Sequence, residues 1–318
     1  MRRLAWVLTD GKAGDEAPCL GVAEALGCRI ECRHVAPRPL LALAMPWGPL
    51  DPREAPGRPG SPIAPPFPDL VIASGRRAIP YVRRIKQASG GRTFTVILKD
   101  PRTGAGSADL IWVPEHDALR ASNVIVTLTA PHRISAERLA TVRGAPDPRL
   151  AGLSHPRVAV LVGGDSRHHR FTPADTERFA SDLRRLADEG ASLMITASRR
   201  TPGPLRQALA SFGDRPGHFL WNGKGENPYL SLLANADAIV ATADSTNMVG
   251  ESCATGVPVL VFEPSGGHRK ITAYLDALVR YGAVRRFAGR LEAFRYEPLD
   301  TTPEIAMAVA RGLDLHRS

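Results

Sequence analysis

The fold is decided by the stretch AIVATADSTNMVGESCATGVPVLVF, residues 238–262. Its first residues, Ala238–Ala241, are small or β-branched, as is typical of a buried strand. Asp244-Ser-Thr-Asn247 then supplies capping side chains for a helix, and Gly256 ends that helix. Because a second apolar run, Val257–Phe262, follows at once, the stretch predicts a strand–helix–strand unit in a parallel sheet.

The same alternation of a short apolar run, a turn and a helical stretch repeats along the chain. In the first half, the predicted strands are Leu4–Thr9, Arg29–His34, Leu70–Ser74, Phe94–Leu98, Leu110–Val113 and Val124–Thr127. In the second half, they are Val158–Val162, Ser192–Thr196, His218–Trp221, Ala238–Ala241 and Val257–Phe262. Two sets of strands with helices between them predict an α/β protein with two Rossmann-like domains.

A stretch rich in proline and glycine separates the two sets. It runs from Thr129 to Arg157 and carries no strand signal beyond its start, as is typical of a domain boundary. We therefore predict a first domain over residues 1–150 and a second over residues 151–318. Thr302 can cap a final helix that runs to Leu315, so we expect this helix to close the second domain.

Length and composition exclude several classes of protein. The chain has 318 residues, of which 43% are apolar and 23% are charged, and this balance excludes global disorder. No apolar run reaches the roughly 18 residues of a transmembrane helix. The four cysteines indicate reduced thiols in a cytosolic protein, and no Cys or His spacing predicts a metal site.

The net charge of +9 predicts anionic partners. Nearly all of the positive charge is arginine, whose rigid donor fork suits phosphates and carboxylates, although coding bias also produces arginine-rich chains. Nucleic acid is disfavoured because the arginines are dispersed and only 6% of the residues are aromatic.

Prolines crowd the segment from Pro37 to Pro68, so Asp51–Pro68 cannot form regular structure. The piece before it, Pro39–Leu50, is apolar enough to require burial or a partner. It either covers the core as a loop or forms a patch at a membrane interface. The patch would consist of Leu40, Leu41, Leu43, Met45 and Trp47, beside Arg33, Arg38 and Arg53.

The loop after the first strand is a candidate ligand site. It carries Asp10, Gly11, Lys12, Gly14, Asp15 and Glu16 and opens onto a predicted helix. At such a point, free N–H groups and the helix dipole meet at the carboxyl end of a strand. Asp15 and Glu16 either stabilise the dipole or supply a general base.

Two loops of the second half carry further candidates. Gly163, Gly164, Asp165 and Ser166 follow the first strand of that half, where the glycines would allow close backbone approach to a ligand. Arg199 and Arg200 follow the next strand and are suited to phosphate contacts, although a solvated turn has the same composition.

The helix cap at residues 244–247 is the most specific candidate. A helix start of this kind can receive a diphosphate, and Glu251 lies on the same helix at a position suited to a ribose diol. The following strand delivers Glu263 to the same edge, and Asn227 belongs to the same block. An anion site with a carboxylate about two turns away matches a nucleotide sugar.

This block resembles the donor-binding half of GT-B glycosyltransferases. More narrowly, five ordered motifs resemble the elongated-mitochondria (mitochondrial fission) family and its bacterial relatives. They are Thr9-Asp-Gly-Lys-Ala-Gly-Asp15, Gly163-Gly-Asp165, Ser198-Arg-Arg-Thr-Pro202, Asn227-Pro-Tyr229 and Thr242-Ala-Asp-Ser-Thr-Asn-Met248. The first loop lacks the catalytic histidine of well-known GT-B members.

The resemblance implies a role for each candidate. Ser245, Thr246 and Asn247 would bind the donor diphosphate and Glu251 the ribose, with Gly163–Ser166 at a cleft between the two domains. Asn227, Asp244 and Glu263 would lie on the same donor side, and Arg199 and Arg200 would stabilise the leaving diphosphate. Asp15 or Glu16 would be the base in an acceptor loop with Asp10, Gly11, Lys12 and Gly14.

The implied activity is that of an inverting, metal-independent glycosyltransferase without a cofactor. It would move a sugar from a nucleotide-sugar donor to a lipid-linked or polysaccharide acceptor. The protein would be cytoplasmic and peripheral on the anionic inner face of a bacterial membrane. The alternative is a non-catalytic scaffold that retains the fold. A sugar-nucleotide epimerase is disfavoured, because the chain lacks G-x-G-x-x-G at its start and a Tyr-x-x-x-Lys motif.

Overall fold

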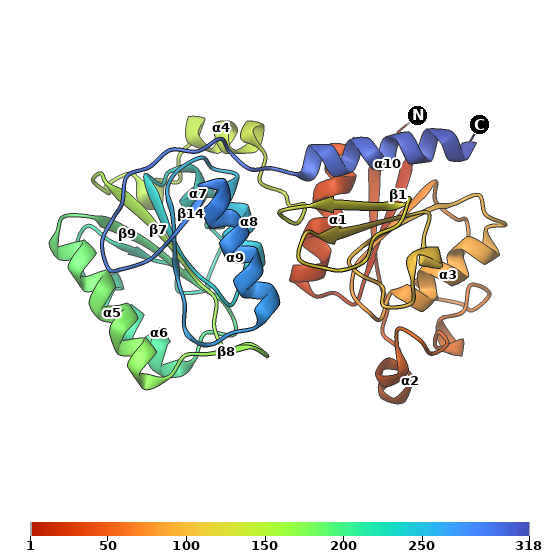
Figure 1. Cartoon of the computed structure of the whole chain (residues 1–318), viewed down its shortest axis with the longest axis horizontal. Helices are drawn as coiled ribbons and strands as arrows, with labels where there is room; N and C mark the ends of the chain where they lie inside the picture. The colour runs from red at the N-terminus through yellow and green to blue at the C-terminus, as the bar shows by residue number, and fades with distance from the viewer. Residues whose placement is uncertain (1, 318) are drawn as a thin grey trace. The chain divides into compact units, whose positions relative to one another are not determined.

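The computed structural model describes residues 2–317 and divides into two compact units (Figure 1). The first unit runs to Arg133 and takes in the end of the chain from Thr301, and the second is Ile134–Asp300. Each unit is built on a parallel six-stranded sheet with helices on it, which confirms the predicted α/β fold of two Rossmann-like halves.

The sheet of the first unit has the strand order β2-β1-β3-β4-β5-β6. Its strands are β1 (Leu4–Thr9), β2 (Arg29–His34), β3 (Leu70–Ala73), β4 (Phe94–Leu98), β5 (Leu110–Pro114) and β6 (Val124–Thr127). Its α-helices are α1 (Ala13–Ala25), α2 (Pro39–Ala44), α3 (Ile79–Ala88) and α10 (Thr302–Arg317). Single 3-10 turns occur at Pro52–Glu54 and Ala105–Ser107.

Alternation along the strands supplies both faces of this sheet with apolar side chains. Ala5 and Val7 point to the face covered by α1 and α10, and Trp6 and Leu8 point to the face covered by α3. Strands buried on both faces read as continuous apolar runs, which is why the sequence pattern located them.

The second unit has the strand order β10-β9-β7-β11-β12-β14. The strands are β7 (Arg157–Val162), β9 (Ser192–Ala197), β10 (Phe219–Leu220), β11 (Ala238–Thr242), β12 (Val259–Phe262) and β14 (Val284–Arg286), with a separate antiparallel pair of β8 (His169–Arg170) and β13 (Ser265–Gly266). The helices are α4 (Ala136–Gly144), α5 (Pro173–Asp188), α6 (Gly203–Gly213), α7 (Tyr229–Ala234), α8 (Thr246–Cys253) and α9 (Arg269–Tyr281), with a 3-10 turn at Pro148–Leu150.

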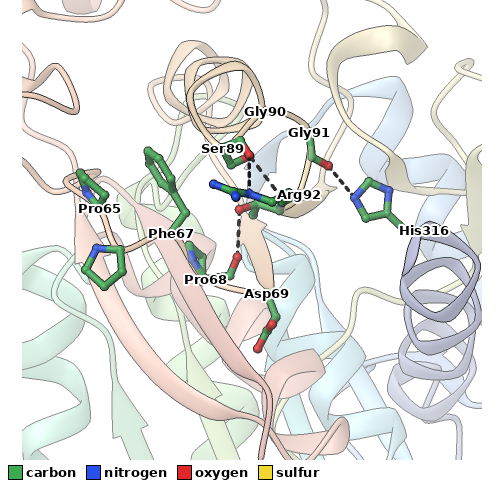
Figure 2. A pocket seen from close by; sticks show the side chains of 11 residues that line it. Pro65, Phe67, Pro68, Asp69, Ser89, Gly90, Gly91, Arg92 and His316 are labelled. Carbon is green, nitrogen blue, oxygen red and sulfur yellow. Dashed lines mark hydrogen bonds between the residues drawn. The ribbon is translucent and has the colours of Figure 1, made fainter. Parts of the chain in front are cut away.

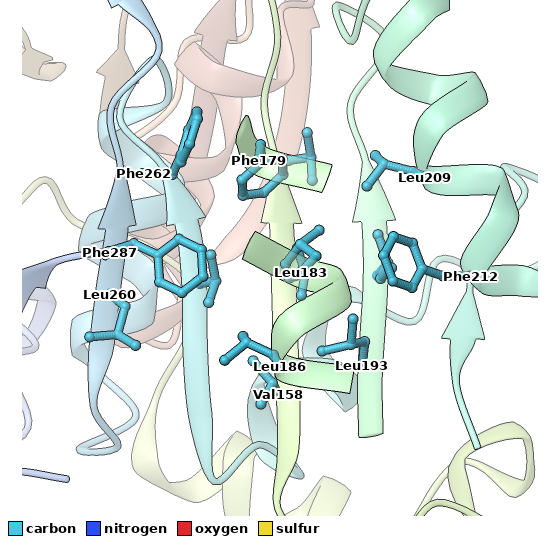
Figure 3. Close-up of a cluster of buried hydrophobic side chains, with 14 of the residues drawn as sticks. Val158, Phe179, Leu183, Leu186, Leu193, Leu209, Phe212, Leu260, Phe262 and Phe287 are labelled. Carbon is cyan, nitrogen blue, oxygen red and sulfur yellow. The ribbon is translucent and has the colours of Figure 1, made fainter. Parts of the chain in front are cut away.

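The core of the second unit lies between its sheet and helices α5 and α6 (Figure 3). Phe179, Leu183 and Leu186 project from α5 onto strand residues such as Val158 and Leu260. Helix α5 begins with a capping box in which Thr172 and Asp175 exchange hydrogen bonds between side chain and backbone. Strands β8, β13 and β14 have two or three residues each, which is too short to produce a periodic sequence signal.

The division into units differs from the predicted one in two places. The first unit ends at Arg133 rather than near residue 150, and α10 packs on α1 and β4 in the first unit rather than closing the second (Figure 1). The side chain of Thr301 bonds to Thr129, and that of Thr302 bonds to His132, so the returning chain is fixed to the end of the first unit. The amphipathic period of a helix identifies its buried face but not its partner.

The proline-rich stretch Asp51–Pro68 contains no α-helix or strand, as expected. None of the helices between residues 2 and 317 combines the length and the apolar character needed to cross a membrane.

Replacing Ile305 tests the place of α10 in the first core. Ile305 is fully buried against that core, whereas Met307 on the same helix is 58% exposed. Ile305→Ala should lower the free energy of unfolding of the first unit by about 2–5 kcal/mol, because it leaves a cavity. Met307→Ala should change it by no more than about 0.5 kcal/mol. Urea denaturation followed by the fluorescence of Trp6 and Trp112, both buried in this unit, measures the effect; equal effects of the two substitutions would contradict this packing.

Candidate functional site

Asp244 is the central side chain at the carboxyl end of the second sheet. Its carboxylate is fully buried and follows β11 directly. Oδ2 accepts hydrogen bonds from the Gly164 N–H and from Nη2 of Arg200, both at 2.9 Å, and Oδ1 accepts one from Oγ1 of Thr242 at 2.7 Å. Because Gly164 follows β7 and Arg200 follows β9, one carboxylate joins the loops of three neighbouring strands.

The two glycines after β7 are required by this packing. A Cβ on Gly163 would lie 2.2 Å from Oδ2 of Asp244, and a Cβ on Gly164 would lie 2.2 Å from the carbonyl carbon of Arg200. The sequence predicted close approach of a ligand to these glycines. The structure instead fills the space beside both with the protein's own atoms.

The adjacent arginines Arg199 and Arg200 have different roles. Besides Asp244, Arg200 bonds to the carbonyl oxygens of Gly164 and Asp165 at 3.3 and 3.0 Å. Arg199 is exposed, and its side chain makes no hydrogen bond within residues 2–317. Arg200 therefore holds the loops together, and of these two arginines it is Arg199 whose guanidinium is free for a phosphate.

Helix α8 begins where the sequence places a diphosphate site. Its helical hydrogen bonds begin with the Val249 N–H, which donates to the carbonyl of Ser245 at 3.1 Å, and the Ser245 side chain makes no capping bond. The hydroxyl of Tyr274, on α9, donates to the carbonyl of Thr246 at 3.2 Å. The first turn, which includes Asn247, is thus held from the side by α9 and keeps the positive end of its dipole toward the loops.

Glu251 lies on α8 beside Tyr229, the first residue of α7. The Tyr229 hydroxyl donates to Oε2 of Glu251 at 2.5 Å. Burial raises the pKa of Glu251 to about 7, although the hydrogen bond from Tyr229 acts in the opposite direction. Asn227 accepts a hydrogen bond from the Tyr229 N–H at 3.1 Å and so shapes the turn that positions this tyrosine.

Three other predicted donor residues support local structure. Oδ1 of Asp165 accepts the Phe171 N–H at 2.9 Å, and Oγ of Ser166 accepts the N–H groups of His168 and His169 at 3.2 and 3.0 Å. Glu263 forms an ion pair with Arg286 on the edge strand β14.

A second cluster of charged groups occupies the carboxyl end of the first sheet. Oδ2 of Asp10 pairs with Nζ of Lys12 and lies 3.4 Å from Nη1 of Arg77. The Asp10 side chain is only 4% exposed, and its Oδ1 has no hydrogen-bond partner in the described part of the chain. Gly11, with φ +77°, makes the turn after Asp10, and Gly14 lies in the first turn of α1.

Asp15 and Glu16 point to different neighbours. Oδ1 of Asp15 accepts a hydrogen bond from Oγ of Ser74 at 2.9 Å and lies 3.6 Å from Nζ of Lys99. Oε2 of Glu16 lies 2.5 Å from Nε2 of His34 and accepts a hydrogen bond from Oγ1 of Thr9. The two carboxylates are thus held in separate contacts, and only Glu16 has a histidine beside it.

Sequence reasoning missed His34, Ser74, Arg77 and Lys99. Each lies at the end of β2, β3 or β4 or a few residues beyond it. Strands β2 and β3 adjoin β1 in the sheet, and β4 adjoins β3. Applying the strand-end rule to every strand, and not only to β1, would have found them. The first loop itself contains no histidine, but His34 on the neighbouring strand β2 lies beside Glu16 of that loop.

The apolar segment Pro39–Leu50 is only partly the predicted patch. Leu40, Leu43 and Trp47 are 83%, 70% and 64% exposed, whereas Met45 is buried and Leu41 packs against the core. Arg38 and Arg53 both bind the buried carboxylate of Asp51. Burial alone would raise the pKa of Asp51, but the hydrogen bonds from these two residues lower it below its usual range.

The arginines near the patch also differ from the prediction. Arg33 stacks over Trp6 and pairs with Glu31, so it is not part of the patch. Arg76 and Arg83 bond instead to the carbonyl oxygens of Met45 and Pro46 at 3.2 and 2.9 Å. The exposed patch is therefore Leu40, Leu43 and Trp47, next to anchored arginines that the sequence did not indicate.

A pocket of about 720 Å³ lies at the opposite, amino ends of β3 and β4 (Figure 2). Its lining includes Phe67, Pro68, Arg92 and His316 but no predicted site residue. Arg92 and His316 bond to backbone carbonyls of the loop before β4, at Ser89 and Gly91 (Figure 2). No group of three or more His, Cys, Asp or Glu side chains within residues 2–317 is arranged to hold a metal ion.

Comparison with known proteins identifies the family. A family model described as mitochondrial fission ELM1 matches residues 13–313. The chain belongs to this family. The mitochondrial fission protein ELM1 of Arabidopsis thaliana is 30% identical over 273 residues, which cover 77% of this chain and 64% of the plant protein. An uncharacterized protein of Rickettsia prowazekii is 27% identical over 169 residues, or 50% of this chain and 48% of that protein. The chain thus covers less than two thirds of the length of these relatives.

Solved structures show that this family member has the GT-B type of fold. A UDP-GlcNAc 2-epimerase of Neisseria meningitidis, solved with UDP-GlcNAc, has a TM-score of 0.54 at 14% identity over 98% of this chain and 100% of its own. MurG of Acinetobacter baumannii has a TM-score of 0.50 at 14% identity over 99% of each chain. A glycosyltransferase of kitacinnamycin has a TM-score of 0.52 at 14% identity over 99% and 96%. At identities this low, the similarity shows a shared fold but not a shared activity.

One argument from the sequence is weakened by these structures. The missing G-x-G-x-x-G and Tyr-x-x-x-Lys motifs disfavour only an epimerase that uses those motifs. Because a UDP-GlcNAc 2-epimerase shares the present fold, the fold does not separate a transferase from an epimerase.

Arg199 and Arg200 provide a matched pair for testing the Asp244 network. Arg200→Ala should lower the free energy of unfolding of the second unit by about 2–3 kcal/mol, because it leaves a buried carboxylate without its counter-charge. Arg199→Ala should change it by no more than about 0.5 kcal/mol. Circular dichroism in urea measures both variants, and equal stability losses would show that Arg200 does not hold these loops.

Proposed function

We propose that the protein is a nucleotide-sugar-dependent glycosyltransferase whose second unit binds the donor. The observation that carries this proposal is that the start of α8, at Ser245–Asn247, and the carboxylate of Glu251 lie on one helix. A diphosphate fits the N–H groups and dipole of a helix start, and a carboxylate about two turns along it is an acceptor for ribose hydroxyls. Membership of the family and the fold shared with nucleotide-sugar enzymes support this assignment.

On the acceptor side, we assign the base to the pair Glu16–His34. The carboxylate of Glu16 holds one ring nitrogen of His34 at 2.5 Å, as an orienting carboxylate does in a catalytic dyad. His34 is half exposed, so an acceptor hydroxyl has access to the ring. Asp15 is the weaker candidate, because it accepts a hydrogen bond from Ser74 and faces the cation of Lys99.

In this mechanism, His34 takes the proton of the acceptor hydroxyl as its oxygen attacks the anomeric carbon. The bond from that carbon to the diphosphate breaks, and the negative charge that develops is stabilised by the start of α8 and by Arg199. Arg200 is excluded from this role because its donors are bound to Asp244 and to backbone carbonyls. Attack opposite the leaving group inverts the anomeric centre.

Calorimetry with UDP-, GDP-, ADP- and CMP-sugars tests the donor site. One of these nucleotides should bind, and Glu251→Ala should weaken its binding, whereas Glu263→Ala, which alters a carboxylate paired with Arg286, should not. Binding of none of them would refute the donor site.

Conversion of UDP-GlcNAc to its C2 epimer without any acceptor would indicate an epimerase instead of a transferase. If the protein is a non-catalytic scaffold, a strain that lacks the gene should be fully complemented by the His34→Ala variant.

The raised pKa of Glu251 predicts how donor binding depends on pH. Below pH 7, the carboxyl group of the free protein is protonated and accepts hydrogen bonds poorly; above pH 7, it is ionised and accepts them well. Affinity for a nucleotide sugar, whose esterified diphosphate does not titrate in this range, should therefore rise between pH 6 and pH 8 with a midpoint near 7. Calorimetry at several pH values measures this rise, and Glu251→Gln should flatten it. An unchanged pH profile in this variant would assign the titration to another group.

We also propose that the exposed patch Leu40, Leu43 and Trp47 rests on an anionic membrane, where the acceptor is held. Apolar side chains bury in the interface while neighbouring arginines attract anionic headgroups. Leu40→Asp with Trp47→Asp should abolish flotation with vesicles that contain anionic lipid. Met307→Asp, a matched change at an exposed apolar residue of α10, should not affect flotation. If the patch variant floats as well as the wild-type protein, the patch does not bind the membrane and the segment only covers the core.

A further inference from the structure

The loops that follow β7 and β12 pair with each other and carry several basic residues. We call residues 166–170 and 265–270 the basic hairpin, although its two strands come from loops that are far apart in the sequence. Its two short strands, β8 and β13, pair antiparallel, with Ser265 opposite Arg170 and Gly266 opposite His169. Because β11 lies between β7 and β12 in the sheet, this pairing joins the loops on both sides of the carboxyl end of β11, where α8 begins.

The two halves of the basic hairpin are closely joined. The Gly267 N–H donates to the carbonyl of His168 at 2.6 Å. Gly266 has φ +103°, and a Cβ there would lie 2.4 Å from the carbonyl oxygen of His168, so only glycine permits this contact. The basic hairpin is thus a built structure and not two independent solvated loops.

Positive charge gathers on this hairpin. The imidazole rings of His168 and His268 lie 4.4 Å apart, and the His268 ring accepts the N–H of Lys270, which caps α9. Burial and the charges of His168, Arg269, Lys270 and Arg167 all lower the pKa of His268.

Three permanent charges of the hairpin, Arg167, Arg170 and Arg269, face solvent without an ion pair among residues 2–317. The acidic groups of the same loops are engaged elsewhere. Asp165 accepts the Phe171 N–H, and Glu263 pairs with Arg286.

His169 adds an independent sign of a ligand. Its side chain is 4% exposed, and its Nδ1 is buried without a hydrogen-bond partner in the described part of the chain. Burial lowers the pKa of His169, and the nearby carboxylate of Asp244 opposes this effect. The charge of Asp244, which precedes the start of α8, thus acts on this ring. A buried ring nitrogen without a partner at this point is a group to which a ligand hydroxyl can bond.

We propose that the basic hairpin binds a carboxylate on the sugar of the donor, so that the substrate is the nucleotide derivative of an acidic sugar. This inference rests on the proposed donor site and adds the class of sugar. A diphosphate at the start of α8 would have its sugar near the hairpin, because the hairpin joins the loops on both sides of that point. The guanidinium forks of Arg167 and Arg269 match a carboxylate in geometry and charge, and Nδ1 of His169 bonds to a ring hydroxyl.

Matched donors that differ only in this charge test the proposal. UDP-glucuronate and UDP-glucose form one pair, GDP-mannuronate and GDP-mannose form a second, and UDP and GDP alone serve as references. By calorimetry at low salt, the acidic member of one pair should bind at least about 10-fold more tightly than its neutral partner. High salt should narrow this difference, because the arginines are exposed.

Arginine variants locate the effect. Arg269→Gln and Arg167→Gln should remove the preference for the acidic donor and leave the affinity for UDP or GDP unchanged. Arg280→Gln makes the same change of charge at the far end of α9 and should keep the preference. Equal affinity of the wild-type protein for the acidic and neutral donors, with the nucleotide still bound, overturns this inference alone. Failure of every nucleotide to bind overturns the donor site as well.

Discussion

The buried carboxylate of Asp244 organises the end of the second sheet on which all the proposed donor contacts depend. It collects hydrogen bonds from the loops after β7 and β9 and from the last residue of β11. A fully buried charge is tolerated only when counter-charge and hydrogen bonds surround it. This requirement explains the two adjacent glycines, the orientation of Arg200 and the position at which α8 begins. The start of α8 is thus a fixed structure before any ligand arrives, as an anion site must be if its dipole is to contribute to binding.

In the first unit, too, the ends of neighbouring strands bring charged side chains together, but here they are acid–base groups. Parallel strands end at one edge of their sheet, so residues distant in sequence meet there without any local motif. Glu16 from α1 and His34 from β2 become neighbours in this way, as do Asp15 and Ser74. The result is a cluster of acid–base groups on the first unit and, on the second, the helix start at which we propose that a diphosphate binds.

Sequence reasoning located the strands because burial on both faces leaves continuous apolar runs. It placed the start of α8 and Glu251 on one helix for a similar reason, since the turn before this helix is local. It was wrong about the cap, because Ser245 makes no capping bond and Asp244 bonds to Gly164 and Arg200 instead. It misplaced α10, because the partner of an amphipathic face is a long-range property that no window of sequence contains.

It also treated Arg199 and Arg200 as equivalent, although only Arg200 bonds to Asp244. It interpreted Gly163 as a ligand contact, although the side chain of Asp244 occupies the space beside it. Both errors arose because the position of Asp244 in the folded chain is not visible in the sequence. His34 could have been predicted from the sequence. It is the last residue of a predicted strand, and it was left out of the candidate site only because the prediction considered the first loop alone.

The central claim is that the start of α8 and Glu251 together bind a nucleotide sugar. A crystal structure of the protein grown with the sugar nucleotide that binds most tightly tests this claim most directly. The account predicts the diphosphate against the first turn of α8 and the ribose hydroxyls within hydrogen-bond distance of Glu251. An ordered nucleotide bound elsewhere, for example in the pocket lined by Phe67 and Arg92, with the start of α8 empty, would contradict it.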